Sequence, residues 1–273
     1  MVVLKILLVI KTGSKISFVG ESKGDNVDVI KLCKPEEIKK IRGRASFDYL
    51  MAVDHKKSSI FNFTKKKPFQ KKAKIIALEG LNCCGKTTQK HLLEEQLRQG
   101  KSSISIVPTY ETPCWEIMSK IGKGTFYINK PIEDTVIWAT YFIDQVYNVK
   151  KELEENDFVI FDRYKDNYRF IQQAIMEFYK INFSKEWLED LVSELPEPDY
   201  AIFIDISSKE MKKRYEKRGG RVPLEVTDLE ISEKARELFI HKYLLNKSQI
   251  VDGTLSPHEI SKNIYKYIKN NGG

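Results

Sequence analysis

Short apolar runs alternate with longer amphipathic stretches from Lys74 to the end of the chain. Runs rich in Ile, Val and Phe are typical of strands buried on both faces, whereas apolar residues spaced three and four apart are typical of helices that cover a sheet. This alternation indicates an α/β fold, with a parallel sheet, helices on both faces, and ligands at the carboxyl ends of the strands. The pattern predicts strands at 75–78, 103–107, 158–161, 200–206 and 249–252, and helices at 87–99, 114–122, 133–154, 168–179, 209–217, 228–245 and 257–269.

The first 54 residues carry a different pattern, which predicts a small α+β unit. Two strands at 2–10 and 15–19 would form a hairpin, followed by a strand at 27–33, a short helix at 36–41 and a strand at 47–53. A unit of about 54 residues is marginal as an independent fold, so we expect it to dock on the main domain. The domain prediction is therefore an N-terminal unit at 1–54, a lysine-rich linker at 55–73 and a main domain at 74–273.

One strand–helix junction carries a complete nucleotide-binding motif. Gly80 is followed after four residues by Gly85, Lys86 and Thr87, between a predicted strand and a predicted amphipathic helix. In this phosphate-binding loop the backbone N–H groups wrap a phosphate, the lysine reaches the outer phosphates, and the hydroxyl binds Mg²⁺. The sequence therefore predicts a site for ATP and Mg²⁺. Its predicted phosphate contacts are Gly80, Asn82, Cys83, Cys84, Gly85, Lys86, Thr87 and Thr88.

Two predicted strands end in an aspartate, Asp162 and Asp205, and either could lie beside the phosphate loop. Arg163 and Tyr164 follow the first of them directly. A carboxylate for a metal ion next to a guanidinium for a phosphoryl group suits phosphoryl transfer, where positioning and charge neutralisation do most of the work. We therefore expect Asp162 to bind the metal ion and Asp205 to open a turn.

A basic segment at 212–221 contains the glycine pair Gly219–Gly220. Such a segment can close over nucleotide phosphates and exclude water during transfer, which would make it a lid. The alternative is an exposed basic helix end that the helix dipole favours.

From Lys74 onward the chain resembles the thymidylate kinase branch of the P-loop nucleoside monophosphate kinases, and this resemblance implies a P-loop kinase fold. The segments that carry it are LEGLNCCGKTTQ at 78–89, PTYETP at 108–113, FDRYKDNYRFIQQ at 161–173, PDYAIFIDIS at 198–207 and KRGGR at 217–221.

The resemblance also implies roles for individual residues. Lys86 and Thr87 would bind ATP phosphates and Mg²⁺, Asp162 would lie near the metal ion, and Arg163 would bind the phosphate of the acceptor. Trp138 lies near the position at which the family stacks an aromatic ring on the acceptor base, although core packing of its helix explains it equally well. The remaining implied contacts are Tyr164 and Gln172 for the acceptor, Arg214 for the ATP phosphates, and Arg218 and Arg221 as catalytic lid arginines.

Three positions depart from the family pattern. Asn82 stands where the family usually carries an acid, Ile106–Val107 precede Pro108 where an arginine is usual, and Ala139–Tyr141 contains no arginine. We expect a weaker grip on the acceptor and a looser choice of base than in the family at large.

The leading hypothesis is ATP-dependent phosphorylation of a deoxynucleoside monophosphate, dTMP or a related pyrimidine nucleotide, to the diphosphate. One alternative is a deoxynucleoside kinase, for which Glu111 is the candidate base. Another is a P-loop kinase or nucleotide-dependent factor that acts on nucleic acid through the lysine-rich stretch at 55–74. The partner of the leading hypothesis is a small nucleotide, and a homodimer is left open.

Charge and cysteine usage change this picture little. The net charge of +8 equals the number of lysines between residues 55 and 78, a stretch without Asp or Glu. A solvated linker explains it better than a nucleic-acid contact. The four cysteines lack metal-ligand spacing and fit a reducing, cytoplasmic setting. No apolar run approaches the roughly 20 residues that cross a bilayer, so no membrane contact is expected.

Overall fold

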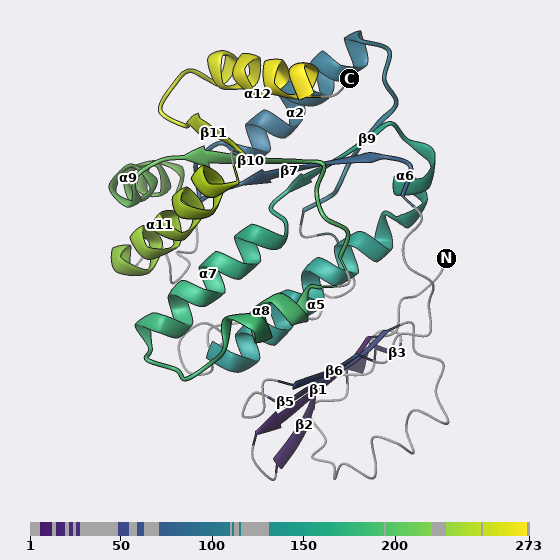
Figure 1. Cartoon of the computed structure of the whole chain (residues 1–273), viewed down its shortest axis with the longest axis vertical. Helices are drawn as coiled ribbons and strands as arrows, with labels where there is room; N and C mark the ends of the chain where they lie inside the picture. The colour runs from purple at the N-terminus through teal and green to yellow at the C-terminus, as the bar shows by residue number, and fades with distance from the viewer. Residues whose placement is uncertain are drawn as a thin grey trace. The chain divides into compact units, whose positions relative to one another are not determined.

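The computed structural model describes part of the chain with side chains and part by its backbone alone (Figure 1). It forms two compact units, Met1–Phe69 with Tyr110–Asn148 and Ile181–Leu195, and Gln70–Thr109 with Val149–Lys180 and Pro196–Gly273. Side chains are described for 71–109, 111, 115, 131–132, 134–193, 195–219, 228–246 and 248–271, and the backbone also for 6–12, 15–19, 22–23, 26–27, 49–54, 59–62 and 133.

The second unit is built on a five-stranded sheet in the order β11-β10-β7-β9-β8. All four pairings are parallel, which confirms the predicted α/β class. Leu78 pairs with Asp162 on one side and with Ile202 on the other, so the carboxyl ends of the three central strands lie together. The strands are β7 (Lys74–Glu79), β8 (Ile104–Ile106), β9 (Phe158–Asp162), β10 (Tyr200–Asp205) and β11 (Gln249–Asp252).

Helices cover both faces of this sheet, as the sequence predicts. Figure 1 shows α2 (Lys86–Gln99) and α12 (Pro257–Asn271) on one face, with α7 (Lys165–Phe178) and α11 (Leu229–Leu245) on the other. Two shorter helices, α6 (Lys150–Glu155) and α9 (Ser208–Arg218), also belong to the described part of this unit. None of the helices in the described part of the chain has the length and hydrophobicity to span a bilayer.

The predicted long helix at 133–154 is wrong as a single element. The chain forms α5 (Pro131–Asn148) and then α6, and the backbone leaves helical geometry at Val149 (φ −105°, ψ 24°). The break also separates the two units, since α5 ends at the last residue of a segment of the first unit. Periodicity alone does not register it, because Val149 is itself buried and apolar.

The first unit contains a four-stranded sheet in the order β2-β1-β5-β6. The predicted hairpin is confirmed as β1 (Ile6–Thr12) and β2 (Lys15–Val19), and the predicted strand at 47–53 as β5 (Tyr49–Asp54), which pairs parallel with β1. A strand inside the predicted linker was missed. It is β6 (Ser59–Asn62), which pairs antiparallel with β5.

Other elements of this unit are small. Helix α8 (Lys185–Leu191) was missed, although Ser184 caps it by accepting from the Trp187 N–H at 3.1 Å. The short strands β3 (Ser22–Lys23) and β4 (Asn26–Val27) pair antiparallel. The rest of the predicted strand at 27–33 and the predicted helices at 36–41 and 114–122 lie outside the described residues, apart from isolated Trp115.

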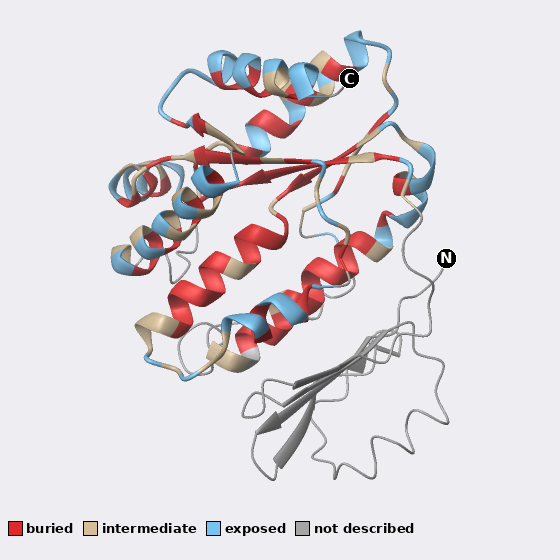
Figure 2. Ribbon diagram, viewed as in Figure 1, coloured by how far each residue is buried: buried red, intermediate tan, exposed pale blue. Residues whose placement is uncertain are grey.

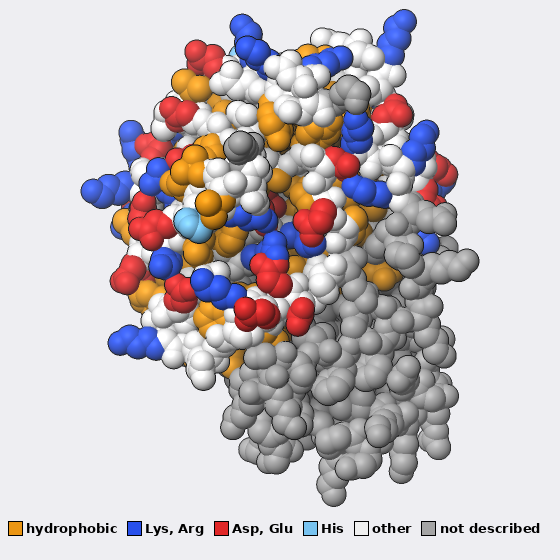
Figure 3. Space-filling view, viewed as in Figure 1, with side chains coloured by type: hydrophobic (Ala, Val, Ile, Leu, Met, Phe, Trp, Pro, Cys, Tyr) orange, Lys and Arg blue, Asp and Glu red, His pale blue; other side chains and the backbone are white. Residues whose placement is uncertain are grey.

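Burial follows the sheet of the second unit closely. In Figure 2 the three central strands, β7, β9 and β10, are mostly buried, and the covering helices turn their exposed residues outward. Basic and acidic side chains are intermixed on the visible face of the described residues (Figure 3). One core cluster includes Ile76, Leu78, Ile202, Ile204, Leu93, Leu97 and Ile264.

An aromatic cluster holds α11 against the opposite side of β10. The rings of Phe203 and Phe239 stack with their centroids 4.7 Å apart and an interplanar angle of 5°. Phe170 of α7 meets the Phe239 ring edge-on at 4.8 Å, and Tyr243 lies beside both Phe203 and Phe239. Phe239 therefore joins α7, α11 and the sheet.

Phe239→Ala tests this role. The substitution should lower the free energy of unfolding by about 3–5 kcal/mol, because it leaves a cavity between three elements. Leu244→Ala is the matched control on the same helix, since Leu244 is exposed, and it should stay within about 0.5 kcal/mol of the wild type. Urea denaturation measures both, and equal losses would contradict the assignment.

Candidate active site

The phosphate loop connects β7 to α2, and its backbone needs glycine at Gly80. Its φ is +139°, and a Cβ there would lie 2.6 Å from the carbonyl oxygen of Ile204 and 2.9 Å from Cys84 Sγ. Gly85 also has a positive φ, +107°, where it caps the N-terminus of α2. The loop therefore turns sharply into the N-terminus of α2, and the first N–H groups of a helix are donors that bind phosphate.

Lys86 lies inside this loop. Its Nζ donates to the carbonyl oxygens of Gly80 at 3.0 Å and Leu81 at 2.7 Å, and it lies 3.4 Å from Cys84 Sγ. Burial, and then the nearby Arg163 guanidinium, lower the pKa of Lys86. The ammonium group is thus fixed at the centre of the loop, with a charge that a phosphate would stabilise.

Thr87 and Asp162 lie together at the entrance of the loop. The Thr87 hydroxyl donates to Asp162 Oδ2 at 2.5 Å, and Asp162 is buried at the end of β9. In the part of the chain that the structure describes, no three His, Cys, Asp or Glu side chains form a metal cluster. An oxygen pair of this kind fits Mg²⁺, which is usually held by one or two protein oxygens together with water and substrate phosphates.

Arg163 follows Asp162 and reaches the phosphate loop. Its backbone is in the left-handed region, with φ +78°, and its N–H donates to Leu78 O at 2.9 Å. The guanidinium donates to Asn167 Oδ1 at 2.6 Å and to Asn82 Oδ1 of the phosphate loop. A left-handed backbone costs a non-glycine residue about 1–3 kcal/mol, which the surrounding contacts must offset. The structure therefore brings the predicted acceptor arginine and the predicted nucleotide loop together.

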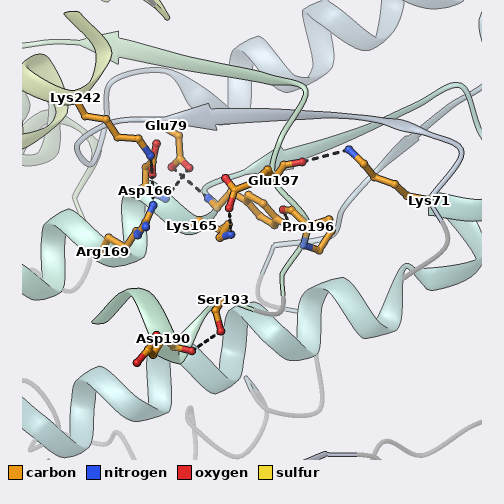
Figure 4. Close-up of polar contacts among 11 residues, drawn as sticks. Lys71, Glu79, Lys165, Asp166, Arg169, Asp190, Ser193, Pro196, Glu197 and Lys242 are labelled. Atoms are coloured by element: carbon orange, nitrogen blue, oxygen red, sulfur yellow. Dashed lines mark hydrogen bonds and ion pairs between the residues drawn. The ribbon is translucent and has the colours of Figure 1, made fainter. Parts of the chain in front are cut away.

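Glu79, which was not predicted from the sequence, lies at the base of this site. Its carboxyl group is almost fully buried and accepts from the backbone N–H groups of Tyr164, Asp166 and Asn167 at 3.2, 3.2 and 3.1 Å. Figure 4 shows Glu79 beside Asp166. Burial, and then the charge of Asp166, raise the pKa of Glu79 to about 8. Its position in the sequence could have indicated this role, because an acidic residue there ends an apolar strand directly before the first glycine of the loop.

The predicted lid is described only up to Gly219. Arg214 donates to the carbonyl oxygens of Cys83 at 3.4 Å and Gly253 at 3.0 Å, so this arginine contacts the phosphate loop. Arg218 is exposed and lies over the Tyr215 ring at 4.8 Å. Arg221 lies outside the described residues, so the lid stays a prediction.

The other loop residues differ in their exposure. Cys84 is buried in the core, Cys83 is half-buried, and Thr88 is exposed at the start of α2. Asp205 does not share the loop with Asp162, because it forms a bidentate ion pair with Arg236 of α11 at 2.6 and 2.9 Å. Asp162 is thus the strand-end aspartate at the phosphate loop.

The residues predicted to contact the acceptor, Tyr164, Gln172 and Trp138, are buried or half-buried within the protein. Tyr164 is fully buried and its hydroxyl donates to Pro196 O at 2.9 Å, while Gln172 is buried on α7. Trp138 is half-buried in an aromatic cluster, with ring centroids 6.3 Å from Trp115, 5.4 Å from Tyr141 and 6.5 Å from Phe142. Core packing thus accounts for Trp138, and its contact with an acceptor base stays a prediction.

Two residues of the alternative hypotheses are also described. Glu111, the candidate base of a deoxynucleoside kinase, is exposed. Lys71, from the lysine-rich stretch, forms an ion pair with Asp199 at 2.6 Å and donates to Glu197 O at 3.2 Å. Residues 55–58 and 63–70 lie outside the described residues, so a nucleic-acid contact there is untested.

Comparison with known proteins gives one consistent result. The family model for thymidylate kinase matches residues 78–264. The thymidylate kinase of Mycoplasmopsis agalactiae is 28% identical over 210 residues, which cover 72% of this chain and 95% of the relative. That of Thermoanaerobacter pseudethanolicus is 28% identical over 207 residues, with 72% and 98% covered. The structure of Candida albicans thymidylate kinase superposes with a TM-score of 0.58 at 20% identity, covering 73% of this chain and 92% of that one, and so shares the fold.

Lys86→Ala should lower the turnover of ATP by about 10²–10³-fold, because it removes a fixed positive charge from the position where charge develops. Lys262→Ala, an exposed lysine on α12, is the control and should match the wild type. ADP release measures both, and circular dichroism checks that the fold is kept. Near-normal turnover in Lys86→Ala would overturn the loop assignment.

Glu79 should make stability depend on pH. Between its ordinary pKa of 4.5 and about 8, the unfolded chain releases the Glu79 proton while the folded chain keeps it. The free energy of unfolding should therefore fall as pH rises through this window, by up to about 1.4 kcal/mol per pH unit. Urea denaturation between pH 5 and pH 8 should show a smaller fall in Glu79→Gln. Parallel curves for the two proteins would exclude Glu79 as the source.

Proposed function

Because the chain belongs to the thymidylate kinase family, a family of ATP-dependent nucleotide kinases, we propose that it transfers the γ-phosphoryl group of ATP to the phosphate of dTMP, giving dTDP and ADP. The observation that carries this proposal is the placement of Arg163. Its guanidinium is bound to Asn82 of the phosphate loop, next to the Thr87–Asp162 pair. A nucleoside offers no anion at this position, whereas a monophosphate does.

Arg163 is prepared for an anionic acceptor before the acceptor arrives. Asn82 and Asn167 hold the guanidinium through amide oxygens, which are neutral and do not cancel its charge. A charge-assisted contact with phosphate is roughly twice as strong as a neutral hydrogen bond. The donors are also fixed, so little reorganisation is needed during the transfer.

Lys86 supplies the second fixed charge, on the ATP side. In the loop it donates to the Gly80 and Leu81 carbonyl oxygens, and a phosphate oxygen would be a stronger acceptor for the same ammonium. Burial lowers the pKa of Lys86. Bound nucleotide phosphates would act in the opposite direction, because a nearby negative charge favours the protonated, charged form of the lysine. Arg214, on the Cys83 carbonyl, adds a basic group beside the loop.

Thr87 and Asp162 would hold Mg²⁺ together with the phosphates of ATP. The bound ion would neutralise charge on the outer phosphates. The two protein oxygens are already adjacent, so the chain contributes its share of the ligands without rearrangement.

An acceptor panel tests the proposal. ADP release with ATP should be faster with dTMP and dUMP than with thymidine or deoxycytidine, by about tenfold to a hundredfold, because only the monophosphates offer a charged partner to Arg163. Arg163→Ala should remove most of this preference and raise the KM for dTMP while leaving the KM for ATP nearly unchanged. Arg98→Ala, whose exposed guanidinium pairs with Glu94 on α2, is the matched control and should leave both unchanged.

A different order of acceptor activities would indicate a different enzyme class. If thymidine or deoxycytidine exceeds every monophosphate, the protein is a deoxynucleoside kinase. Base preference within the monophosphates is expected to be loose, so activity with several pyrimidine nucleotides supports the proposal.

A further inference from the structure

Helix α7 begins two residues after Arg163, and a buried carboxyl group holds its first turn. Glu79 Oε1 accepts from the Asp166 N–H, and Oε2 accepts from the N–H groups of Tyr164 and Asn167. The first N–H groups of a helix have no partner within the helix and carry partial positive charge. Glu79 satisfies these groups from the end of β7, so the position of the helix start depends on one side chain of the strand that leads into the phosphate loop.

Asn167 extends this contact to the arginine. Its backbone N–H donates to Glu79, its Nδ2 donates to Gly80 O at 2.7 Å, and its Oδ1 accepts from Arg163 at 2.6 Å. One residue thus connects the buried carboxyl group, the phosphate loop and the acceptor arginine. A shift of the helix start would move the Asn167 side chain and, with it, the guanidinium.

Other contacts fix the same turn from the outside (Figure 4). Lys165 forms an ion pair with Glu197, and Asp166 pairs with Lys242 of α11 at 2.5 Å and with Arg169 at 3.4 Å. None of these three ion pairs includes Asn167 or Arg163. They stabilise the turn, whereas Glu79 and Asn167 form the direct connection to the guanidinium.

The cost of this arrangement indicates a role beyond packing. A buried carboxyl group is expensive compared with the apolar residues that fill the rest of β7, and its raised pKa reflects that cost. Its three N–H partners offset part of it. An apolar side chain would fill the same volume but would leave the helix start without acceptors.

We propose that Glu79 is a positioning residue, which holds the first turn of α7 so that Asn167 fixes the Arg163 guanidinium at the phosphate loop. This inference rests on the proposed function, in which Arg163 binds the phosphate of the acceptor. Glu79 does not touch the substrate; it acts through Asn167 and Arg163.

A double-mutant cycle separates this role from a general loss of stability. Glu79→Gln keeps the size of the side chain but replaces one acceptor oxygen with an amide NH₂, which cannot accept from the helix. It should raise the KM for dTMP and lower kcat/KM by about tenfold, the effect of one or two lost hydrogen bonds, with the Kd for ATP nearly unchanged. In the Arg163→Ala background the same change should have less than about a twofold effect, because the guanidinium that it positions is gone.

Two further variants complete the design. Asn167→Ala keeps all three backbone N–H groups for Glu79 and removes only the side-chain connection, so it should reproduce the kinetic effect and also depend on Arg163. Glu197→Gln breaks the ion pair with Lys165 on the same turn, at a largely exposed side chain, and should leave kcat/KM near the wild-type value. Thermal unfolding of each variant is recorded in parallel.

The outcomes are distinguishable. Two results would overturn the positioning role. One is a Glu79→Gln loss in kcat/KM that is as large in the Arg163→Ala background as in the wild type. The other is a loss of ATP affinity as large as the loss in kcat/KM. If Glu79→Gln does not fold, the cycle of Asn167→Ala with Arg163→Ala tests the link through which Glu79 is proposed to act, and independent losses in that cycle would overturn the proposal. The cycle compares rates among variants, so it can use whichever acceptor the wild type phosphorylates. A wild type that accepts only nucleosides would overturn the proposed function, while the cycle still decides whether Glu79 acts through Arg163.

Discussion

The parallel pairing of β7 with β9 is the constraint on which the site depends. Its register sets Leu78 beside Asp162, and the Arg163 N–H continues the ladder by donating to Leu78 O. The phosphate loop begins two residues after Leu78, so the loop and the Asp162–Arg163 pair leave the sheet at the same level. A slip of one residue would reverse the sides to which the β9 side chains point and would separate Asp162 from Thr87. The register is protected because both strands are buried on both faces.

The site combines three ionisable groups that the fold has already taken out of water. Glu79, Lys86 and Asp162 are all buried, and each is held by backbone groups or a hydroxyl. Desolvation makes each of them costly, so each must be satisfied within the protein. The same burial fixes their positions before a nucleotide binds, and a fixed positive charge such as that of Lys86 is the kind that stabilises a transferring phosphoryl group most.

Much of this arrangement was predictable because it depends on local pattern. The five parallel strands, the phosphate loop and the Asp162–Arg163 pair follow from apolar runs and from residue spacing. Glu79 was not predictable in the same way, since its partners lie about 85 residues further along the chain and depend on the pairing of two strands. The sequence favoured Asp162 over Asp205 because Arg163 follows it directly, but the ion pair of Asp205 with Arg236 of α11 depends on tertiary packing and could not be read from local pattern. Helix α8 and strand β6 were missed because both are short.

The three departures from the family pattern all change the charge around the proposed acceptor site, and Asn82 is the one that contacts Arg163. An acid at this position would form an ion pair with the Arg163 guanidinium, to which the Asn82 side chain is bound. The amide keeps the hydrogen bond but leaves the arginine its full charge. Ile106–Val107 and Ala139–Tyr141 lack the basic residues usual in the family, so positive charge is lost from two places. If Arg163 binds the acceptor phosphate as proposed, the removal of one negative charge next to it would offset part of that loss. The accuracy with which its guanidinium is held would then contribute directly to the binding of the acceptor.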